Sequence, residues 1–278
     1  MSKNKLVSPV LKWVGGKRQL LPSIKLMLPK RITSYCEPFV GGGAVLFDLQ
    51  PKKAIVNDIN IDLIHVYTVI RDDVDALIEI LETYPNEESF YYELRYIDRD
   101  KSKYDRLSDI EKAARVIFLN KTCYNGLYRV NNAGEFNSPF GKYKNPNIVN
   151  APVLKAVSNY FNSAEITFSS NDFALSLEQV RRGTFVYLDP PYDPISDTSS
   201  FTGYSKGGFS REQQIKLREC CDMLNERGVK FMLSNSSTEF IREQYSDYHI
   251  TTVQAKRAIN SVASKRGDVD EVIITNYE

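Results

Sequence analysis

A carboxylate, two prolines and an aromatic ring follow a strand-like run in the segment FVYLDPPYDP at 185–194. Proline fixes its own φ and restricts the residue before it, so Asp189, Pro190 and Pro191 form a stiff turn. The Asp189 carboxylate and the Pro190 carbonyl can then face one small donor group while the ring of Tyr192 stacks on a flat partner. This combination suits the exocyclic amine of a nucleobase. A plain Asp-Pro-Pro turn at a strand end is the simpler interpretation.

The chemistry of such an amine explains why two fixed acceptors are useful. Its lone pair is delocalised into the ring, so the nitrogen is a weak nucleophile. Two acceptors on its hydrogens favour a pyramidal nitrogen and offset the positive charge that develops during attack on a methyl sulfonium. A base in a duplex has to leave the stack in order to reach such a pocket. The segment therefore favours methyl transfer to a nucleobase amine.

A glycine-rich turn lies between a predicted strand and a predicted helix in CEPFVGGGAVLFDL at 36–49. Glycine at 41–43 allows a sharp turn and the close approach of a ligand. In VNDIN, Asp58 ends the next strand, where an acid is well placed to accept hydrogen bonds from ribose hydroxyls. Neither G-x-G-x-x-G nor a P-loop is present, which disfavours a dinucleotide or a triphosphate. The pair predicts an adenosine ligand without pyrophosphate.

The segment LKWVGGKRQL at 11–20 supplies two further groups. Trp13 offers a flat apolar wall, and Lys17 offers a cation for a carboxylate. A ligand that combines adenosine with an amino-acid carboxylate is S-adenosylmethionine. Taken singly, Trp13 is better explained by core packing and Lys17 by solvation.

The composition is that of a folded protein. Its 278 residues suit one large domain or a core domain with an insertion, and 42% of them are hydrophobic. No stretch is apolar enough to span a bilayer, and MSKNKLVSPVLKW lacks the apolar run of a signal peptide, so we expect a cytoplasmic protein without a membrane partner. The four cysteines form no C-x-x-C pair, and His65 and His249 lie far apart, so we expect no metal site.

Basic residues are unevenly distributed. The first 36 residues hold eight Lys and Arg and no acid. The segment 115–147 holds five basic residues, which are Arg115, Lys121, Arg129, Lys142 and Lys144, against the single acid Glu135. Residues 72–111, in contrast, are rich in acids. This asymmetry favours a polyanion on one face, and a solvated charged surface is the alternative.

Several short runs rich in β-branched and aromatic residues are typical of buried strands. They are 34–39, 53–58, 165–170, 183–189, 229–234, 249–255 and 270–277. Helical patterns lie between most of them, which predicts an α/β sheet that is at least partly parallel. The predicted helix 211–228 places four residues near one face, namely Ile215, Leu217, Cys221 and Leu224. Gly228 supplies its C-terminal stop.

The middle of the chain, 71–164, shows helices but few convincing strands. Helix 108–120 has Ser108 as N-cap and Glu111 completing a capping box. The segment YRVNNAGEFN at 128–137 predicts a hairpin that turns at Asn132-Ala133-Gly134. We therefore predict that 71–164 is an insertion or second lobe on the sheet domain.

Together, DPPY, EPFVGGG and KWVGGK resemble the DNA adenine-N6 methyltransferases of the Dam type, which include the GATC-specific methylases of restriction–modification systems. The likeness runs from Leu11 to Tyr277. It implies a Rossmann-like S-adenosylmethionine-dependent methyltransferase sheet with an inserted, mainly helical target-recognition lobe that carries a β-hairpin. Residues 1–70 and 165–278 would form the catalytic, cofactor-binding domain, and 71–164 the lobe.

The resemblance implies a double-stranded DNA partner, a flipped adenine as acceptor and three sets of site residues. The cofactor contacts are Trp13, Lys17, Phe39, Gly41, Gly43, Asp58, Asp172, Phe173 and Asp189. The catalytic set is Asp189, Pro190, Pro191 and Tyr192. The DNA contacts are Lys12, Lys121, Tyr124, Asn125, Leu127, Arg129, Pro139 and Lys142. A cognate restriction endonuclease acting on the same site is compatible with the likeness, and no stable complex with it is expected.

The segment YNGLYRVNNAGEFNSPFGKYKNP at 124–146 resembles the hairpin by which GATC methylases read DNA. The likeness implies that Arg129 reads the outer guanine through its bidentate fork. The other implied roles are apolar base contacts for Leu127 and Pro139, a wedge in the stack for Tyr124, a phosphate contact for Asn125, and the second guanine for Lys12. Lys121 and Lys142 stand where some relatives carry arginine, as phosphate contacts. Hairpin packing is the alternative for Tyr124 and Leu127.

Three other functions fit parts of the pattern. A methyltransferase acting on RNA or on protein glutamine often carries asparagine in place of Asp189 and usually lacks a basic hairpin lobe. A DNA-binding protein without catalysis conflicts with an intact Asp189 and Tyr192. A nucleotide phosphotransferase, suggested by GGK, lacks P-loop spacing.

Overall fold

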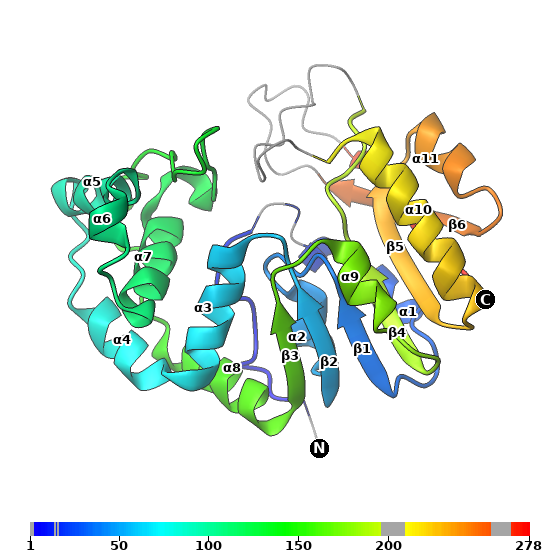
Figure 1. Ribbon diagram of the computed structural model, residues 1–278, viewed down its shortest axis with the longest axis horizontal. Helices are drawn as coiled ribbons and strands as arrows, with labels where there is room; N and C mark the ends of the chain where they lie inside the picture. Colours follow the sequence, from blue (N-terminus) through cyan, green and yellow to red (C-terminus); the bar gives the residue numbers. More distant parts are fainter. Residues whose placement is uncertain (1–2, 14, 16, 196–208, 257–267) are drawn as a thin grey trace.

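The chain forms a seven-stranded sheet with helices on both sides and a helical part beside it (Figure 1). The computed structural model describes residues 3–13, 15, 17–195, 209–256 and 268–278. The strands are β1 (Ser34–Glu37), β2 (Lys53–Asn57), β3 (Glu165–Ser169), β4 (Thr184–Leu188), β5 (Lys230–Ser236), β6 (His249–Lys256) and β7 (Asp268–Thr275). Each lies within or next to a run expected from the sequence, and the predicted mixed α/β sheet is confirmed.

The strand order places the carboxyl ends of the parallel strands along one edge. The order is β3-β2-β1-β4-β5-β7-β6, with β1 to β5 parallel and β7 antiparallel to both of its neighbours. The loops that follow β1, β2, β3 and β4 therefore leave the sheet on the same side. In open α/β sheets this edge is where ligands bind.

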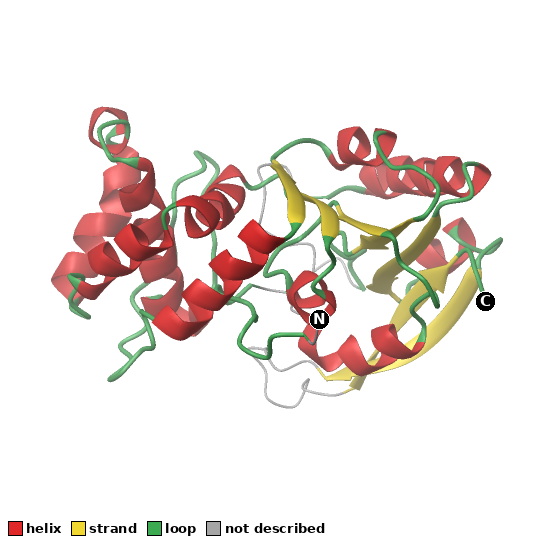
Figure 2. Ribbon diagram, turned by 90° about the horizontal axis from the view of Figure 1, so that it is seen from below, coloured by secondary structure: helices red, strands yellow, loops and turns green. Residues whose placement is uncertain are grey.

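Alternation along the strands gives the sheet two apolar faces. In β4, Phe185 and Tyr187 join one core, whereas Val186 and Leu188 join the other. The first core includes residues of α1 (Leu21–Leu26), α2 (Ala44–Leu49), α3 (Ile61–Asp72) and α8 (Ala151–Ser163). The second includes residues of α9 (Phe173–Glu178), α10 (Arg211–Glu226) and α11 (Glu239–Gln244). Figure 2 shows helices on both sides of the strands.

The helical part is continuous with the first core rather than separate from it. It is made of α4 (Val74–Glu82), α5 (Glu88–Tyr96), α6 (Lys101–Tyr104) and α7 (Asp109–Thr122), with the short 3-10 turns η2 (Ile97–Arg99) and η3 (Tyr124–Gly126). Leu77, Tyr91 and Phe118 of this part lie in the same apolar cluster as Tyr35 and Tyr187 of the sheet. Within the described residues, none of the helices combines the length and apolar character that crossing a membrane requires.

Three local predictions can be compared with the structure. The Ser108–Glu111 capping box at the start of α7 is confirmed. A hairpin-like turn is present, with Val130 facing Phe136 in an isolated antiparallel bridge and the Gly134 amide donating to the Asn131 carbonyl at 2.9 Å. The prediction for α10 was wrong at Ile215. That side chain is 42% exposed, because it points away from the stripe formed by Leu217, Cys221 and Leu224.

Candidate active site

The sheet edge brings Lys17, Asp189 and Tyr192 into contact. Lys17 belongs to the short 3-10 turn η1 (Lys17–Gln19), and Asp189 follows directly on β4. The Lys17 ammonium lies 2.8 Å from Asp189 Oδ1 and 4.5 Å from the centre of the Tyr192 ring. It also donates a hydrogen bond to the Gly15 carbonyl at 2.9 Å. Lys17, expected to meet a cofactor carboxylate, here pairs with the carboxylate of the protein itself.

Burial sets the electrostatics of Asp189. Desolvation raises the pKa of Asp189 to about 6, even though the ammonium of Lys17 acts in the opposite direction and Glu271 adds a smaller rise. Asp189 Oδ1 is buried, and among the described residues the Lys17 ammonium reaches it at 2.8 Å. Because lysine is a flexible point charge, a donor brought by a ligand can replace it at this oxygen.

A network of polar side chains, which the sequence reasoning missed, holds the loop after β4 through hydrogen bonds. Gln214 donates to the Pro191 carbonyl at 2.9 Å, and the side chain of Asn235 donates to Gln214 at 3.1 Å. The Asp193 amide donates to Asn235 at 3.1 Å, and the Ser236 hydroxyl donates to the Asp193 carbonyl at 2.7 Å. The signal for this network was the polar run SNSS at 234–237, which forms the carboxyl end of β5 and the residue after it.

Asp58 braces the glycine turn after β1. Its carboxylate accepts the Gly41 amide at 2.9 Å and the Asn60 amide at 3.0 Å. Burial raises the pKa of Asp58 to about 6, and these two hydrogen bonds oppose the rise. Gly41 has φ +47°, and a Cβ there would lie 2.8 Å from the Trp13 ring, so only glycine suits this close approach. Trp13 therefore covers the turn.

Apolar rings and a second acid lie along the same edge. The rings of Phe39 and Phe173 are 5.2 Å apart. Asp172 caps α9 through the Ala174 amide at 2.9 Å and pairs with Lys216 at 3.0 Å. Ile59, which the sequence reasoning did not select, follows Asp58 and is 62% exposed. An exposed apolar side chain beside a braced acid is suited to a ligand with a flat apolar part and nearby hydroxyls.

The structure joins Lys12 to the segment after α7, although the two are far apart in sequence. The Asn120 side chain accepts from the Lys12 amide and donates to the Lys12 carbonyl, both at 2.8 Å. A Cβ at Gly126 would lie 2.3 Å from Lys12 Cδ, so the lysine stem crosses directly over that glycine. Tyr143, another residue not selected from the sequence, lies 5.0 Å from the Lys12 ammonium and accepts the Asn125 amide at 3.0 Å.

The hairpin is held in place by contacts of Tyr128, and Arg129, its predicted base-contacting residue, is exposed. Tyr128 is buried, stacks on Trp13 at 5.0 Å, and donates to Asp62 of α3 at 2.8 Å. Because side chains alternate along an extended segment, its neighbour Arg129 points outward. There Arg129 Nε donates to the side chain of Asn137 on the opposite arm at 2.7 Å.

Of the remaining predicted DNA contacts, four are exposed, which are Tyr124, Asn125, Pro139 and Lys142, and two are half-buried, which are Leu127 and Lys121.

Arg115 is not part of a basic face, which corrects the interpretation of the charge pattern. It is only 3% exposed and pairs with Asp98 at 2.7 Å. It also donates to the carbonyl groups of Leu94 and Arg95 at 2.7 and 3.0 Å. This arginine holds the helices together, because α7 buries the side of the helix on which it stands.

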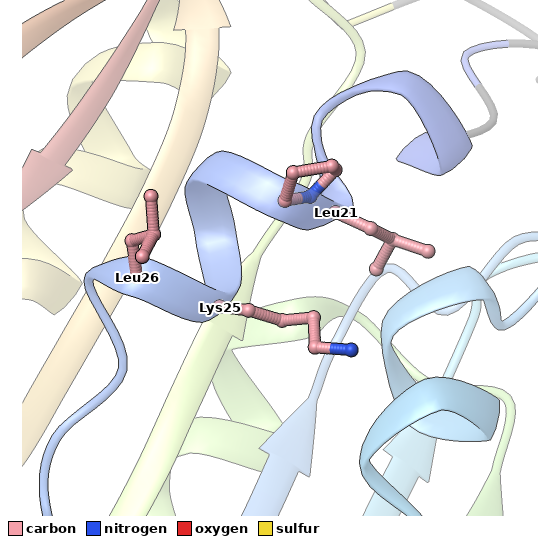
Figure 3. A pocket seen from close by; sticks show the side chains of 4 residues that line it. Leu21, Lys25 and Leu26 are labelled. Atoms are coloured by element: carbon pink, nitrogen blue, oxygen red, sulfur yellow. The ribbon is translucent and has the colours of Figure 1, made fainter.

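A hollow of about 530 Å³ lies on α1, apart from all of these residues (Figure 3). It is lined by Leu21, Pro22, Lys25 and Leu26. The ammonium of Lys25 pairs with Asp48 at 3.2 Å. The hollow contains none of the predicted site residues, and we assign it no part in the chemistry.

Residues 13–259 match the family described as D12 class N6 adenine-specific DNA methyltransferase. The chain belongs to this family. The methyltransferase is 44% identical over 280 residues to the type II methyltransferase M1.LlaDCHI of Lactococcus lactis subsp. cremoris, covering 100% of this chain and 98% of the relative. It is 46% identical to the type II methyltransferase M.MjaIII of Methanocaldococcus jannaschii, with 98% and 99% covered. It is 35% identical to the DNA adenine methylase of Escherichia coli K12, with 95% and 93% covered.

Membership decides between the functions considered from the sequence. The protein is a site-specific DNA methyltransferase that acts on N6 of adenine, with relatives among type II restriction–modification methylases. The predicted family and reaction are confirmed. The alternatives of RNA or protein methylation, of binding without catalysis and of phosphoryl transfer are set aside.

Proposed function

We propose that this methyltransferase transfers the methyl group of S-adenosylmethionine to N6 of a flipped adenine in GATC, by direct attack of the amine. One observation carries the proposal. The buried Asp189 carboxylate and the Tyr192 ring both contact the Lys17 ammonium, on the sheet edge that also carries the glycine turn. A Rossmann-like methyltransferase sheet with an inserted recognition lobe accounts for this arrangement.

The residues along the edge fit S-adenosylmethionine. Asp58 would hold the ribose, because each of its oxygens has spare acceptor capacity beyond the one amide that it binds. Phe39 and Phe173 would flank the adenine ring, with Asp172 at the start of α9 beside them. The turn at Gly41 and Gly43, covered by Trp13, would admit the chain of the ligand. When bound, the cofactor supplies a methyl group activated by its sulfonium.

The residues around Asp189 and Tyr192, here called the catalytic corner, have separate roles toward the adenine. The Asp189 carboxylate and the Pro190 carbonyl accept the two amine hydrogens, and Tyr192 stacks on the base. Pro191, held by Gln214, fixes the loop. Lys17 occupies part of this corner through its pair with Asp189, so its ammonium has to shift when the amine enters. A cofactor carboxylate is the natural new partner for it.

We propose that 1–70 and 165–278 form the catalytic domain and that 71–164 form the target-recognition lobe. The support is the set of exposed side chains next to Lys12 and on the hairpin. Arg129 reads the outer guanine and Lys12 the second. The other roles are apolar base contacts from Leu127 and Pro139, a wedge from Tyr124, and phosphate contacts from Asn125, Lys121 and Lys142. The protein would act in the cytoplasm on duplex DNA, alongside a restriction endonuclease for the same site without a stable complex.

Methyl acceptance from labelled S-adenosylmethionine by a panel of duplexes tests the proposal. The panel holds one GATC duplex and twelve duplexes with a single altered base pair, and it includes flanking controls. Labelling confined to the GATC duplex is expected. Equal labelling of the altered duplexes would contradict the proposed GATC specificity. Labelling of cytosine would contradict the proposed transfer to N6 of adenine.

The rate should fall with acidity because Asp189 must be ionised to accept the amine hydrogens. Burial raises the pKa of Asp189 to about 6, so the carboxylate is ionised above that pH and protonated below it. We expect kcat/KM to be level from pH 7 to 8 and to fall about tenfold per pH unit below 6. DNA binding measured over the same range is the control. A rate that stays level down to pH 5 would contradict this role.

Arg129→Ala should relax specificity at one base pair. The guanidinium is exposed and oriented by Asn137, so its loss removes a bidentate contact worth about 1–3 kcal/mol of discrimination. Rates on the panel should converge for duplexes altered at that pair and keep their ratios elsewhere. Arg106→Ala, an exposed arginine in the same lobe, is the matched control. A uniform loss across all duplexes would instead show a phosphate contact.

A further inference from the structure

Glu271 reaches the catalytic corner from the interior of the sheet. It lies on β7, where it pairs with Ser236 of β5 on one side and with Val253 of β6 on the other. Its carboxylate accepts the hydroxyl hydrogen of Tyr192 at 2.8 Å. Because both neighbouring strands fix the backbone of β7, this acceptor has a defined position relative to the loop after β4.

The Tyr192 ring is held at two places. Glu271 holds the hydroxyl, and the Lys17 ammonium lies over the face at 4.5 Å from the ring centre. Stacking on a base needs only the ring, so phenylalanine would stack as well as tyrosine. The hydroxyl therefore has a separate task, which is to fix the plane of the ring through its bond to Glu271.

Glu271 also adds negative charge near Asp189. Its carboxylate contributes to the raised pKa of Asp189, in the same direction as burial and opposite to Lys17. The other titratable groups that face Asp189 are Glu37 of β1, Tyr187 of β4 and Tyr192. Among the acids near Asp189, Glu271 is the one that accepts the Tyr192 hydroxyl hydrogen within the described residues, and it also adds negative charge near Asp189.

We propose that Glu271 is a positioning residue for adenine methylation, which orients the Tyr192 ring through its hydroxyl and places a negative charge toward Asp189. This inference rests on the proposed roles of Asp189 and Tyr192. It does not depend on the recognition sequence, because it concerns how the base is held once it has entered.

The test is a double-mutant cycle on a duplex that the wild-type enzyme methylates, whichever the panel identifies. Glu271→Leu and Tyr192→Phe should each lower kcat about tenfold, as expected for one lost hydrogen bond to a charged group, with little change in KM for DNA. The combined variant should lose no more than either single variant, because both remove the same bond. Glu271→Gln, whose amide oxygen still accepts, should recover kcat to within about threefold of wild type. Glu79→Leu, an exposed glutamate on α4, is the matched control.

The pH profile separates positioning from general support of the sheet. Glu271→Gln removes a negative charge near Asp189, which lowers the pKa of that carboxyl, so the acid limb should move to lower pH. Losses that multiply to about 100-fold in the combined variant would overturn the proposal, as would wild-type kcat in Tyr192→Phe, a variant that leaves the sheet intact. A wild-type enzyme that prefers a site other than GATC would refute the recognition sequence and leave this comparison standing.

Discussion

Replacement of Asp189 by alanine is expected to reduce kcat by about 10³-fold while DNA and cofactor binding persist. The Asp189 carboxylate is the acceptor proposed for the amine, so its removal takes away stabilisation that matters during attack. Binding persists because the contacts proposed for DNA, and all of those for the cofactor except Asp189 itself, come from other segments of the chain. Single-turnover transfer of labelled methyl groups measures the rate, and fluorescence anisotropy measures DNA binding.

Two companion variants sharpen this experiment. Asp189→Asn keeps the shape and one acceptor oxygen without the charge, so its loss should be intermediate. Asp247→Ala removes an exposed aspartate that pairs with Arg218 at the surface, and it should transfer at the wild-type rate. An Asp189→Ala enzyme with more than a tenth of wild-type activity would remove this residue from the mechanism.

The second large effect concerns stability. Asp98→Ala should lower the free energy of unfolding by about 3–5 kcal/mol, because it leaves the charge of Arg115 buried without its partner. It also removes the acceptor for the Phe136 amide at 2.8 Å, which ties the hairpin to the helices. Denaturant unfolding followed by circular dichroism measures the change.

A surface pair of the same kind gives the control. Asp75 pairs with Lys155 at 2.9 Å, but their side chains are 74% and 56% exposed. Asp75→Ala should therefore change the free energy of unfolding by less than about 1 kcal/mol. Arg115→Met combined with Asp98→Leu should recover part of the loss, since no charge is then buried. Equal losses for Asp75→Ala and Asp98→Ala would show that burial of the pair is not what matters.

Local patterns predicted much of the fold. The run 183–189 could be predicted as a strand because every side chain in β4 is buried, which requires a continuous run of strand-forming residues. The cap of α7 could be predicted because its residues lie within one helical turn. The order of the strands was not predictable, since the pairing of β5 with β7 joins segments far apart in the chain. The family motifs likewise located Asp189 and the glycine turn, but no local signal shows that Lys17 meets Asp189 or that Glu271 meets Tyr192. Arg115 was misinterpreted because an arginine on a helix has the same pattern whether its partner is water or a buried aspartate.

The place of β7 in the sheet has a consequence for biosynthesis. It is the seventh strand to leave the ribosome, yet it belongs between the fifth and the sixth. Until it arrives, the edges of β5 and β6 that β7 pairs with stay open, and such edges are templates for aggregation. We therefore expect polar substitutions at the buried residues Val272, Ile273 and Ile274 of β7 to reduce soluble yield first, with chaperone dependence as the visible phenotype, before any loss in specific activity is detected.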